Sequence, residues 1–196
     1  MVRTGFSPAG WSALREGTGM IAVRRARPTD AAGIGLVHVA SWRSTYAGVL
    51  PEPVLTGLSA PRQAGYYDRV IRGGGVVHVA VASGSDAVPE GEASVVGFVT
   101  ARRQRGHATE GEIETLYVLD DFRERGLGRH LLRTAAAHLA ARGCTSLLVW
   151  VLSDNPARWF YARMGARHAE DGTVGVGGIA VPQAAYRWTS IEPLLD

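Results

Sequence analysis

The sequence of 196 residues contains no lysine and only one cysteine, Cys144. A single cysteine excludes a disulfide scaffold and fits a reducing compartment such as the cytoplasm. No apolar run approaches the roughly 20 residues that a membrane-spanning helix needs. The N-terminal segment also lacks the continuous apolar core of a signal peptide. We therefore expect a soluble cytoplasmic protein that does not act at a membrane.

All 21 basic residues are arginines, set against 18 acidic residues, and the net charge is +3. The arginines are scattered with acids between them, and the two dense runs, at residues 24–27 and 102–105, form no stripe with aromatic residues. Nucleic-acid binding through a basic surface is therefore not favoured, and we expect no nucleic-acid partner. The absence of lysine also excludes the P-loop, whose G-x-x-x-x-G-K-[ST] pattern requires one.

A hydrophobic content of 46% and a charged content of 20% are typical of a single packed domain. Residues 1–19 show no clear period and are predicted to form a flexible extension, with one domain over residues 20–196. The domain pattern predicts a mixed α/β sheet of about six or seven strands with four helices. Strands are predicted at 21–26, 76–82, 94–103, 111–120, 145–152, 166–170 and 184–189, helices over 30–42, up to about 72, over 127–142 and 155–165, and a long polar loop over 83–93.

The segment RERGLGR, at residues 123–129, connects a predicted strand directly to an amphipathic helix. The first N–H groups of a helix have no partner within it and attract anions. Gly126 and Gly128 let an anion approach the backbone closely, and three arginines add positive charge. The segment therefore predicts a pyrophosphate site. The dinucleotide fingerprint does not fit, because it needs three glycines after a first strand.

Residues 123–128 fit R-x-x-G-x-G and resemble the acetyl-CoA pyrophosphate loop of the GCN5-related N-acetyltransferase (GNAT) family. The element order over about residues 20–190 is similar as well. Residues 155–166 resemble the family segment N-x-x-A-x-x-F-Y-x-x-x-G-F, although Ala157 stands one place early and Ala166 replaces the final aromatic residue. The resemblance implies a GNAT-like fold that transfers the acetyl group of acetyl-CoA to a primary amine by direct attack in a ternary complex.

The resemblance also implies where acetyl-CoA binds. In the family, the strand before the loop carries a bulge and separates from the next strand, which leaves a slot for the pantetheine arm. The implied acetyl-CoA contacts are Leu116, Tyr117 and Val118 on the strand, Arg123, Glu124, Arg125, Gly126, Leu127, Gly128 and Arg129 in the loop, and Asn155 and Arg158 at the following helix.

The catalytic groups follow from the same resemblance. Tyr161 takes the place of the general acid that protonates the departing thiolate, unless it is an ordinary core aromatic. Glu112 and Glu114 lie two apart on one strand and are candidates for the base that deprotonates the amine. Glu112 is preferred from its offset to the loop. Glu114, a water chain, or a purely substrate-binding role for these carboxylates stays open.

Residues 42–51 resemble the family segment W-x-x-x-Y-x-G-x-x-P. Trp42, Arg43 and Tyr46 are therefore candidates for binding the acceptor amine, with packing as the alternative. The six histidines show no metal-ligand spacing, so we expect no metal. The acceptor is not identified by the sequence, and a homodimer, which is common in the family, stays open. A non-catalytic acyl-CoA-binding regulatory module on the same fold is the alternative function.

Overall fold

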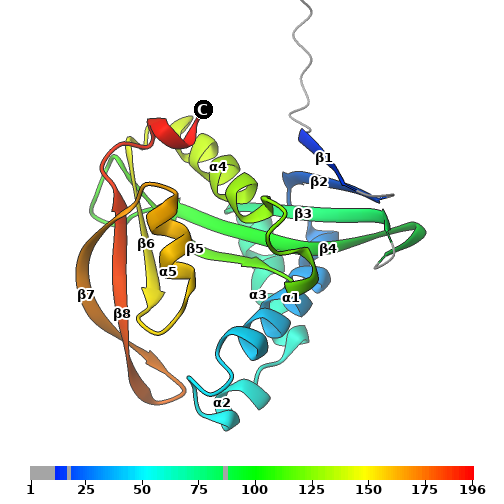
Figure 1. The fold of residues 1–196 in the computed structure, drawn as a ribbon, viewed down its shortest axis with the longest axis horizontal. Coiled ribbons are helices and arrows are strands. Elements are labelled where there is room, and N and C mark those ends of the chain that lie inside the picture. Colours follow the sequence, from blue (N-terminus) through cyan, green and yellow to red (C-terminus); the bar gives the residue numbers. More distant parts are fainter. Residues whose placement is uncertain (1–11, 17–18, 86–87) are drawn as a thin grey trace, which may run out of the picture.

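The computed structural model describes residues 12–16, 19–85 and 88–196 (Figure 1). Within these residues, eight strands form one sheet in the order β1-β2-β3-β4-β5-β6-β8-β7. Every neighbouring pair is antiparallel except β5 and β6, which are parallel. The strands are β1 (Ser12–Glu16), β2 (Gly19–Arg25), β3 (Val76–Ser85), β4 (Val88–Arg103), β5 (Glu110–Val118), β6 (Ser146–Leu152), β7 (Arg167–Val176) and β8 (Ile179–Trp188).

Five α-helices accompany the sheet within the described residues. The predicted mixed α/β architecture is confirmed, and the second predicted helical region divides into two helices around Gly57. The helices are α1 (Ala31–Thr45), α2 (Glu52–Thr56), α3 (Ala60–Arg72), α4 (Leu127–Ala140) and α5 (Ala157–Arg163).

Two segments differ from the sequence-based expectation. Ser12–Glu16 lies in the segment expected to be a flexible extension, yet it pairs with β2 as an edge strand; the rest of residues 1–18 lies outside the described residues. The loop predicted over residues 83–93 is mostly strand, since Ser83 pairs with Ala93 and Ser85 with Val88. The hydrogen bonds of a hairpin join backbone groups and do not require apolar side chains. The polar composition of residues 83–93 therefore led to the wrong prediction of a loop.

Helices cover both faces of the sheet. On one face, α4 buries a helical stripe that includes Leu131, Leu132 and Leu139 against the strands, together with Tyr161 of α5. On the other face, Ile34 and Val37 of α1 pack with Tyr67 of α3 against the sheet. A third cluster joins the end of α1 and α2 to β6, β7 and β8. The candidate active site lies between β5 and β6, where these neighbouring strands of the sheet separate.

Candidate active site

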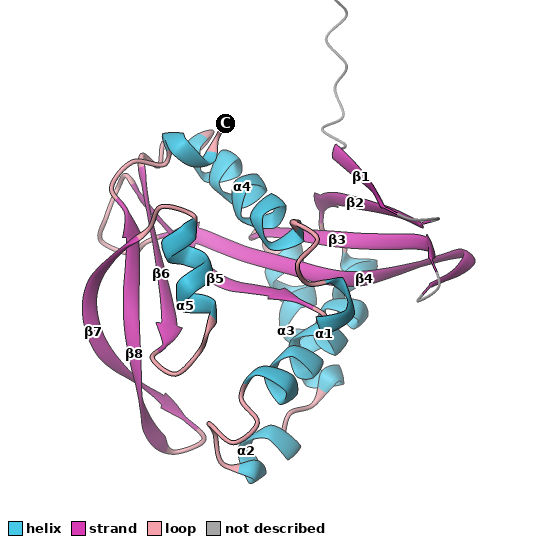
Figure 2. Cartoon of the chain, in the orientation of Figure 1, coloured by secondary structure: helices cyan, strands magenta, loops and turns pink. Residues whose placement is uncertain are grey.

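The parallel strands β5 and β6 separate halfway along their length. They pair from Glu110 opposite Ser146 to Ile113 opposite Val149, and beyond these residues the two strands diverge (Figure 2). The cause lies on β5, where Thr115 pairs with Thr100 but Ile113 pairs with Ala101, so that Glu114 is an extra residue. An extra residue of this kind is a β-bulge, and it bends its strand. The structure therefore has the bulge and the slot that the resemblance implies.

A cavity of about 800 Å³ occupies the gap between the separated strands. Successive residues of β6 line it from both faces of the sheet. Val149 and Val151 belong to the core under α4 and α5, whereas Leu152 belongs to the cluster beside α1 and α2, and all three line the cavity. Because strand side chains alternate between faces, this cavity passes through the sheet and connects its two sides.

One end of the cavity is the loop that leads into α4. Gly126 precedes the helix with φ +78°, and Glu124 also adopts a left-handed backbone with φ +62°. Alternating right- and left-handed residues point successive N–H groups toward one place and form an anion-binding nest. Among the described residues no side chain caps the start of α4. Its first N–H groups are therefore available to an anion.

The loop arginines have different surroundings. Arg123 lines the cavity, but its guanidinium is 2.9 Å from the Asp120 carboxylate and donates to the carbonyl of Val118 and the hydroxyl of Thr45. Arg129 lines the cavity from the first turn of α4. Arg125 lies over the ring of Phe122, at 5.6 Å from its centre, and is not part of the cavity wall. Glu124, Gly126, Leu127 and Gly128 complete this end of the wall.

Asn155 has a structural role that sequence reasoning missed. Its amide nitrogen donates to the Tyr46 hydroxyl at 2.9 Å, and its oxygen accepts from the N–H of Ala157 at 2.8 Å, which caps the start of α5. The buried Asn155 side chain therefore joins α1 to α5 while it lines the cavity. Arg158 donates to the carbonyl of Ser153 and lies over the ring of Trp159, outside the cavity wall.

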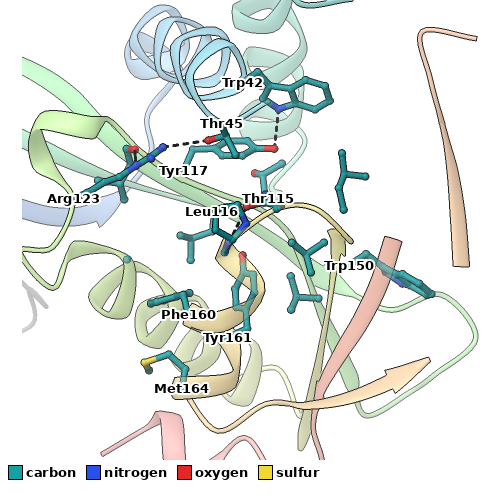
Figure 3. A pocket seen from close by; sticks show the side chains of 18 of the residues that line it. Trp42, Thr45, Thr115, Leu116, Tyr117, Arg123, Trp150, Phe160, Tyr161 and Met164 are labelled. Atoms are coloured by element: carbon teal, nitrogen blue, oxygen red, sulfur yellow. Dashed lines mark hydrogen bonds between the residues drawn. The ribbon is translucent and has the colours of Figure 1, made fainter. Parts of the chain in front are cut away.

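Tyr161 reaches the cavity from α5. Its side chain is 5% exposed, its ring packs in the core against Trp188, and Figure 3 shows its hydroxyl directed toward β5 near Leu116. Burial raises the pKa of Tyr161, so its hydroxyl stays protonated at neutral pH. None of the described residues provides a hydrogen-bond partner for this hydroxyl. Tyr161 is therefore a core aromatic and a cavity residue at once, so these two alternatives do not exclude each other.

The two strand carboxylates share one arginine. Arg102 approaches Glu112 with Nη2 at 2.7 Å and Glu114 with Nε at 3.1 Å. Only Glu114 lines the cavity. Burial raises the pKa of Glu114, and the charge of Arg102 opposes this rise. The bulge thus gives the two carboxylates different surroundings, although they lie two residues apart on one strand.

The α1 aromatics form another wall of the cavity. The indole N–H of Trp42 donates to the Tyr117 hydroxyl at 2.9 Å (Figure 3), and the rings of Trp42 and Tyr46 meet edge to face at 5.1 Å. Both residues line the cavity, as their candidate role requires. Arg43 does not line it, because its guanidinium donates to the carbonyls of Leu55 and Leu58 and so attaches α1 to the segment around α2.

Several cavity residues carried no recognisable signal in the sequence. Trp150 is one of several large apolar residues in β6, so nothing in the sequence distinguishes it from a core residue. The β7–β8 hairpin showed only a weak strand pattern. The residues that sequence reasoning missed are Thr45, Thr115, Phe122, Val149, Trp150, Val151, Leu152, Pro156, Ala157, Phe160, Arg163, Met164, Val174, Val176 and Gln183.

Residues 42–166 match the family described as the acetyltransferase (GNAT) family. The chain belongs to this family. It is 28% identical over 178 residues to the uncharacterized N-acetyltransferase YuaI of Bacillus subtilis (strain 168), covering 89% of this chain and 96% of that protein.

Solved structures share the GNAT fold with this chain. YncA from Salmonella typhimurium, solved with its cofactor acetyl-CoA, superposes with a TM-score of 0.62 at 18% identity, covering 90% of this chain and 94% of that one. PaiA N-acetyltransferase from Thermoplasma acidophilum, solved in complex with coenzyme A, superposes with a TM-score of 0.61 at 18% identity, covering 83% of this chain and 97% of that one. At this level of identity the likeness shows the common fold.

The described part of the chain lacks two further features. No group of three or more His, Cys, Asp or Glu side chains there could hold a metal ion. No helix among the described residues is both long and apolar enough to cross a membrane.

Proposed function

We propose that this GNAT protein transfers the acetyl group of acetyl-CoA to a primary amine by direct attack in a ternary complex. The observation that carries the proposal is a single cavity that passes through the sheet, with an anion-binding loop at one end and Glu114 and Tyr161 farther along its wall. Such a cavity lets two substrates enter from opposite faces and meet between the strands.

The loop and the separated strands fit acetyl-CoA. The free N–H groups at the start of α4, with Arg129 beside them, suit its pyrophosphate. The backbone of residues 114–118 has no strand partner on the β6 side. An extended pantetheine arm can therefore bind there as an added strand along Leu116, Tyr117 and Val118. Gly128 lies close to Phe160, and a Cβ placed there would be in ordinary contact with the ring at 3.5 Å.

The proposed chemistry needs a base, a polarising donor and an acid. Glu114 takes the proton from the ammonium, since it is the strand carboxylate that lines the cavity. Backbone N–H groups beyond the bulge, near Val118, polarise the acetyl carbonyl. The amine nitrogen forms its bond to the acetyl carbon while the carbon–sulfur bond breaks. Tyr161, which is protonated at neutral pH, gives its proton to the sulfur, and its phenolate then takes the second proton of the amine nitrogen as the neutral amide forms.

Calorimetry with acetyl-CoA, CoA and dephospho-CoA, followed by a thiol-release assay with an amine panel, tests the proposal. Tyr161→Phe and Glu114→Gln are each expected to lower kcat by on the order of 10²- to 10⁴-fold with acetyl-CoA binding retained. Glu112→Gln is the matched control, because Glu112 also pairs with Arg102 but does not line the cavity; its effect should be much smaller.

Three results would contradict the proposal in different ways. No binding of any CoA species would remove the acetyltransferase assignment for this chain. Binding without any amine-dependent thiol release would indicate a non-catalytic acyl-CoA-binding module. A larger loss in Glu112→Gln than in Glu114→Gln would reverse the choice of base.

We further propose the cytoplasm as the compartment, where the buried thiol of Cys144 stays reduced; a homodimer stays a prediction.

A further inference from the structure

The end of the cavity opposite α4 and α5 forms a chamber with an apolar wall. We call it the acceptor chamber and define it by six cavity residues, Trp42, Tyr46, Trp150, Leu152, Val174 and Val176. Tyr46 and Leu152 are buried members of the cluster between α1, α2 and the β7–β8 hairpin, and Trp42, Val174 and Val176 pack against it. Trp150 lies against β7 at Gly172, where a Cβ would be only 3.1 Å from the indole ring.

The polar tips of Trp42 and Tyr46 already form hydrogen bonds within the protein. The Tyr46 hydroxyl accepts from Asn155, and the Trp42 indole N–H donates to the Tyr117 hydroxyl. Thr115, at the edge of the chamber, shares a hydrogen bond of 2.7 Å with Thr100. These side chains therefore offer a bound molecule mainly ring and methyl surface.

Among the described residues, the only acid in the cavity wall besides Glu124 of the loop is Glu114. The cavity's arginines are poorly placed for a second charged group on the acceptor. Arg123 is paired with Asp120, and Arg129 and Arg163 come from α4 and α5, which pack on the other face of the sheet. Gln183 contributes a neutral amide. A carboxylate, phosphate or second ammonium in the chamber would lose water without gaining a partner.

The β7–β8 turn borders the chamber on the side of α2. Val174 and Val176 pack in the cluster that contains Leu50 and Leu55, and a Cβ on Gly177 would lie 2.3 Å from Cγ2 of Val54. Figure 1 shows this turn beside α2. The contact bridges the two elements on the acceptor side and so narrows the space between them for an extended chain segment.

Resting on the proposed function, we infer that the acceptor is a small monoamine with an apolar or aromatic body and no second ionised group. Its ammonium lies at Glu114, and its body lies against the rings and methyl groups of the acceptor chamber. Amino acids and polyamines are excluded because their second charged group would have no partner in the chamber. Protein segments are disfavoured because the β7–β8 turn and α2 are in contact on the acceptor side.

Matched pairs of amines test the inference in the thiol-release assay, with product mass confirmed by mass spectrometry. 2-Phenylethylamine is compared with L-phenylalanine, which adds one carboxylate, and hexylamine is compared with 1,6-diaminohexane, which adds one ammonium. We expect kcat/KM to be at least tenfold higher for each monoamine than for its charged partner. Equal or reversed values in both pairs, or preference for a lysine-containing peptide, would overturn the inference.

A variant that places a charge in the chamber makes the test specific to this wall. Val174→Glu should raise the ratio of kcat/KM for 1,6-diaminohexane over hexylamine by about tenfold, because the new carboxylate pairs with the second ammonium. Thr173→Glu is the matched control, since Thr173 is the exposed neighbour on the same strand and does not line the cavity. An unchanged ratio in a folded Val174→Glu protein that still binds acetyl-CoA would count against the chamber as the acceptor site.

Calorimetry of the wild-type protein distinguishes a failure of the acceptor inference from a failure of the proposed function. If acetyl-CoA binds but neither monoamine is acetylated, nor bound in the presence of CoA, the acceptor inference is wrong while the CoA site stands. If acetyl-CoA does not bind at all, the proposed function fails, and the acceptor inference fails with it.

Discussion

Among single residues, Arg102 pairs with both strand carboxylates. Its guanidinium contacts both Glu112 and Glu114, but the bulge leaves only Glu114 at the cavity wall. Burial raises the pKa of Glu114, and the positive charge of Arg102 holds it lower than burial alone would. Arg102 therefore acts on the proposed base without reaching the cavity itself, as a positioning residue.

Arg102→Gln should move the acidic limb of the pH profile of kcat/KM to higher pH. Without the guanidinium the pKa of Glu114 rises, and a base is active only above its pKa, so activity near pH 6 falls more than activity near pH 8. Arg103→Gln is the control, since the exposed Arg103 donates to the carbonyl of Arg142 instead. An acidic limb that stays in place in Arg102→Gln would exclude Glu114 as the titrating base.

Among the elements, the loop before α4 contains two residues in the left-handed backbone region, which L-residues other than glycine rarely adopt. Glu124 and Gly126 both have positive φ, and they flank Arg125 directly before the helix. A non-glycine residue held in this region indicates a conformation that the surroundings enforce, often for binding. The glycine at 126 is needed for its backbone angle and not for space, because no atom lies within 4 Å of a Cβ placed there.

Gly126→Ala should lower both stability and acetyl-CoA affinity, whereas Gly106→Ala should lower stability alone. Both glycines have φ near +80° and open space around a Cβ, so each alanine costs about 1–2 kcal/mol of unfolding free energy. Only Gly126 borders the N–H groups of α4, and losing one good hydrogen bond there weakens binding about tenfold. Urea unfolding and calorimetry measure the two effects; equal acetyl-CoA affinities in the two variants would contradict the loop's assignment.

At the scale of the whole molecule, two buried histidines on opposite faces of the sheet couple folding to pH. His38 of α1 bonds to the Tyr67 hydroxyl, and His78 of β3 lies against His138 of α4. Burial lowers the pKa of His38 and of His78 to about 4. Both are thus neutral in the folded protein, whereas in the unfolded chain they take up protons as pH falls below about 6.5.

The unfolding free energy should therefore fall as pH drops from 7 toward 4. The unfolded chain binds more protons in this window, so each histidine removes on the order of 1–2 kcal/mol by pH 5. His38→Gln and His78→Gln should each reduce the pH dependence in urea unfolding at pH 7, 6 and 5, while His107→Gln, at an exposed position, should leave it unchanged. A wild-type unfolding free energy that is constant from pH 7 to 5 would contradict this.

Elements whose residue pattern is local could be predicted from the amino-acid sequence alone. The loop at 123–129, the apolar stripe of α4, the nearly all-apolar strand β6 and the short helix that carries Tyr161 each depend on residues within a few positions of one another. These patterns also led to the GNAT family. Only the outer part of the β3–β4 hairpin, expected as a loop over residues 83–93, escaped prediction, because its pairing is made by backbone groups across the ladder.

Only the tertiary structure decided which side chains meet in the cavity. Its lining depends on strand register, and one extra residue in a strand moves the following side chains to the other face. The bulge at Glu114 therefore separates Glu114 from Glu112, and pairing between β6, β7 and β8 brings Trp150, Val174 and Gln183 to the wall. Arg125 and Arg158 are turned away from it by local contacts with the Phe122 ring and the Ser153 carbonyl, and Arg43 is turned away by the Leu55 carbonyl.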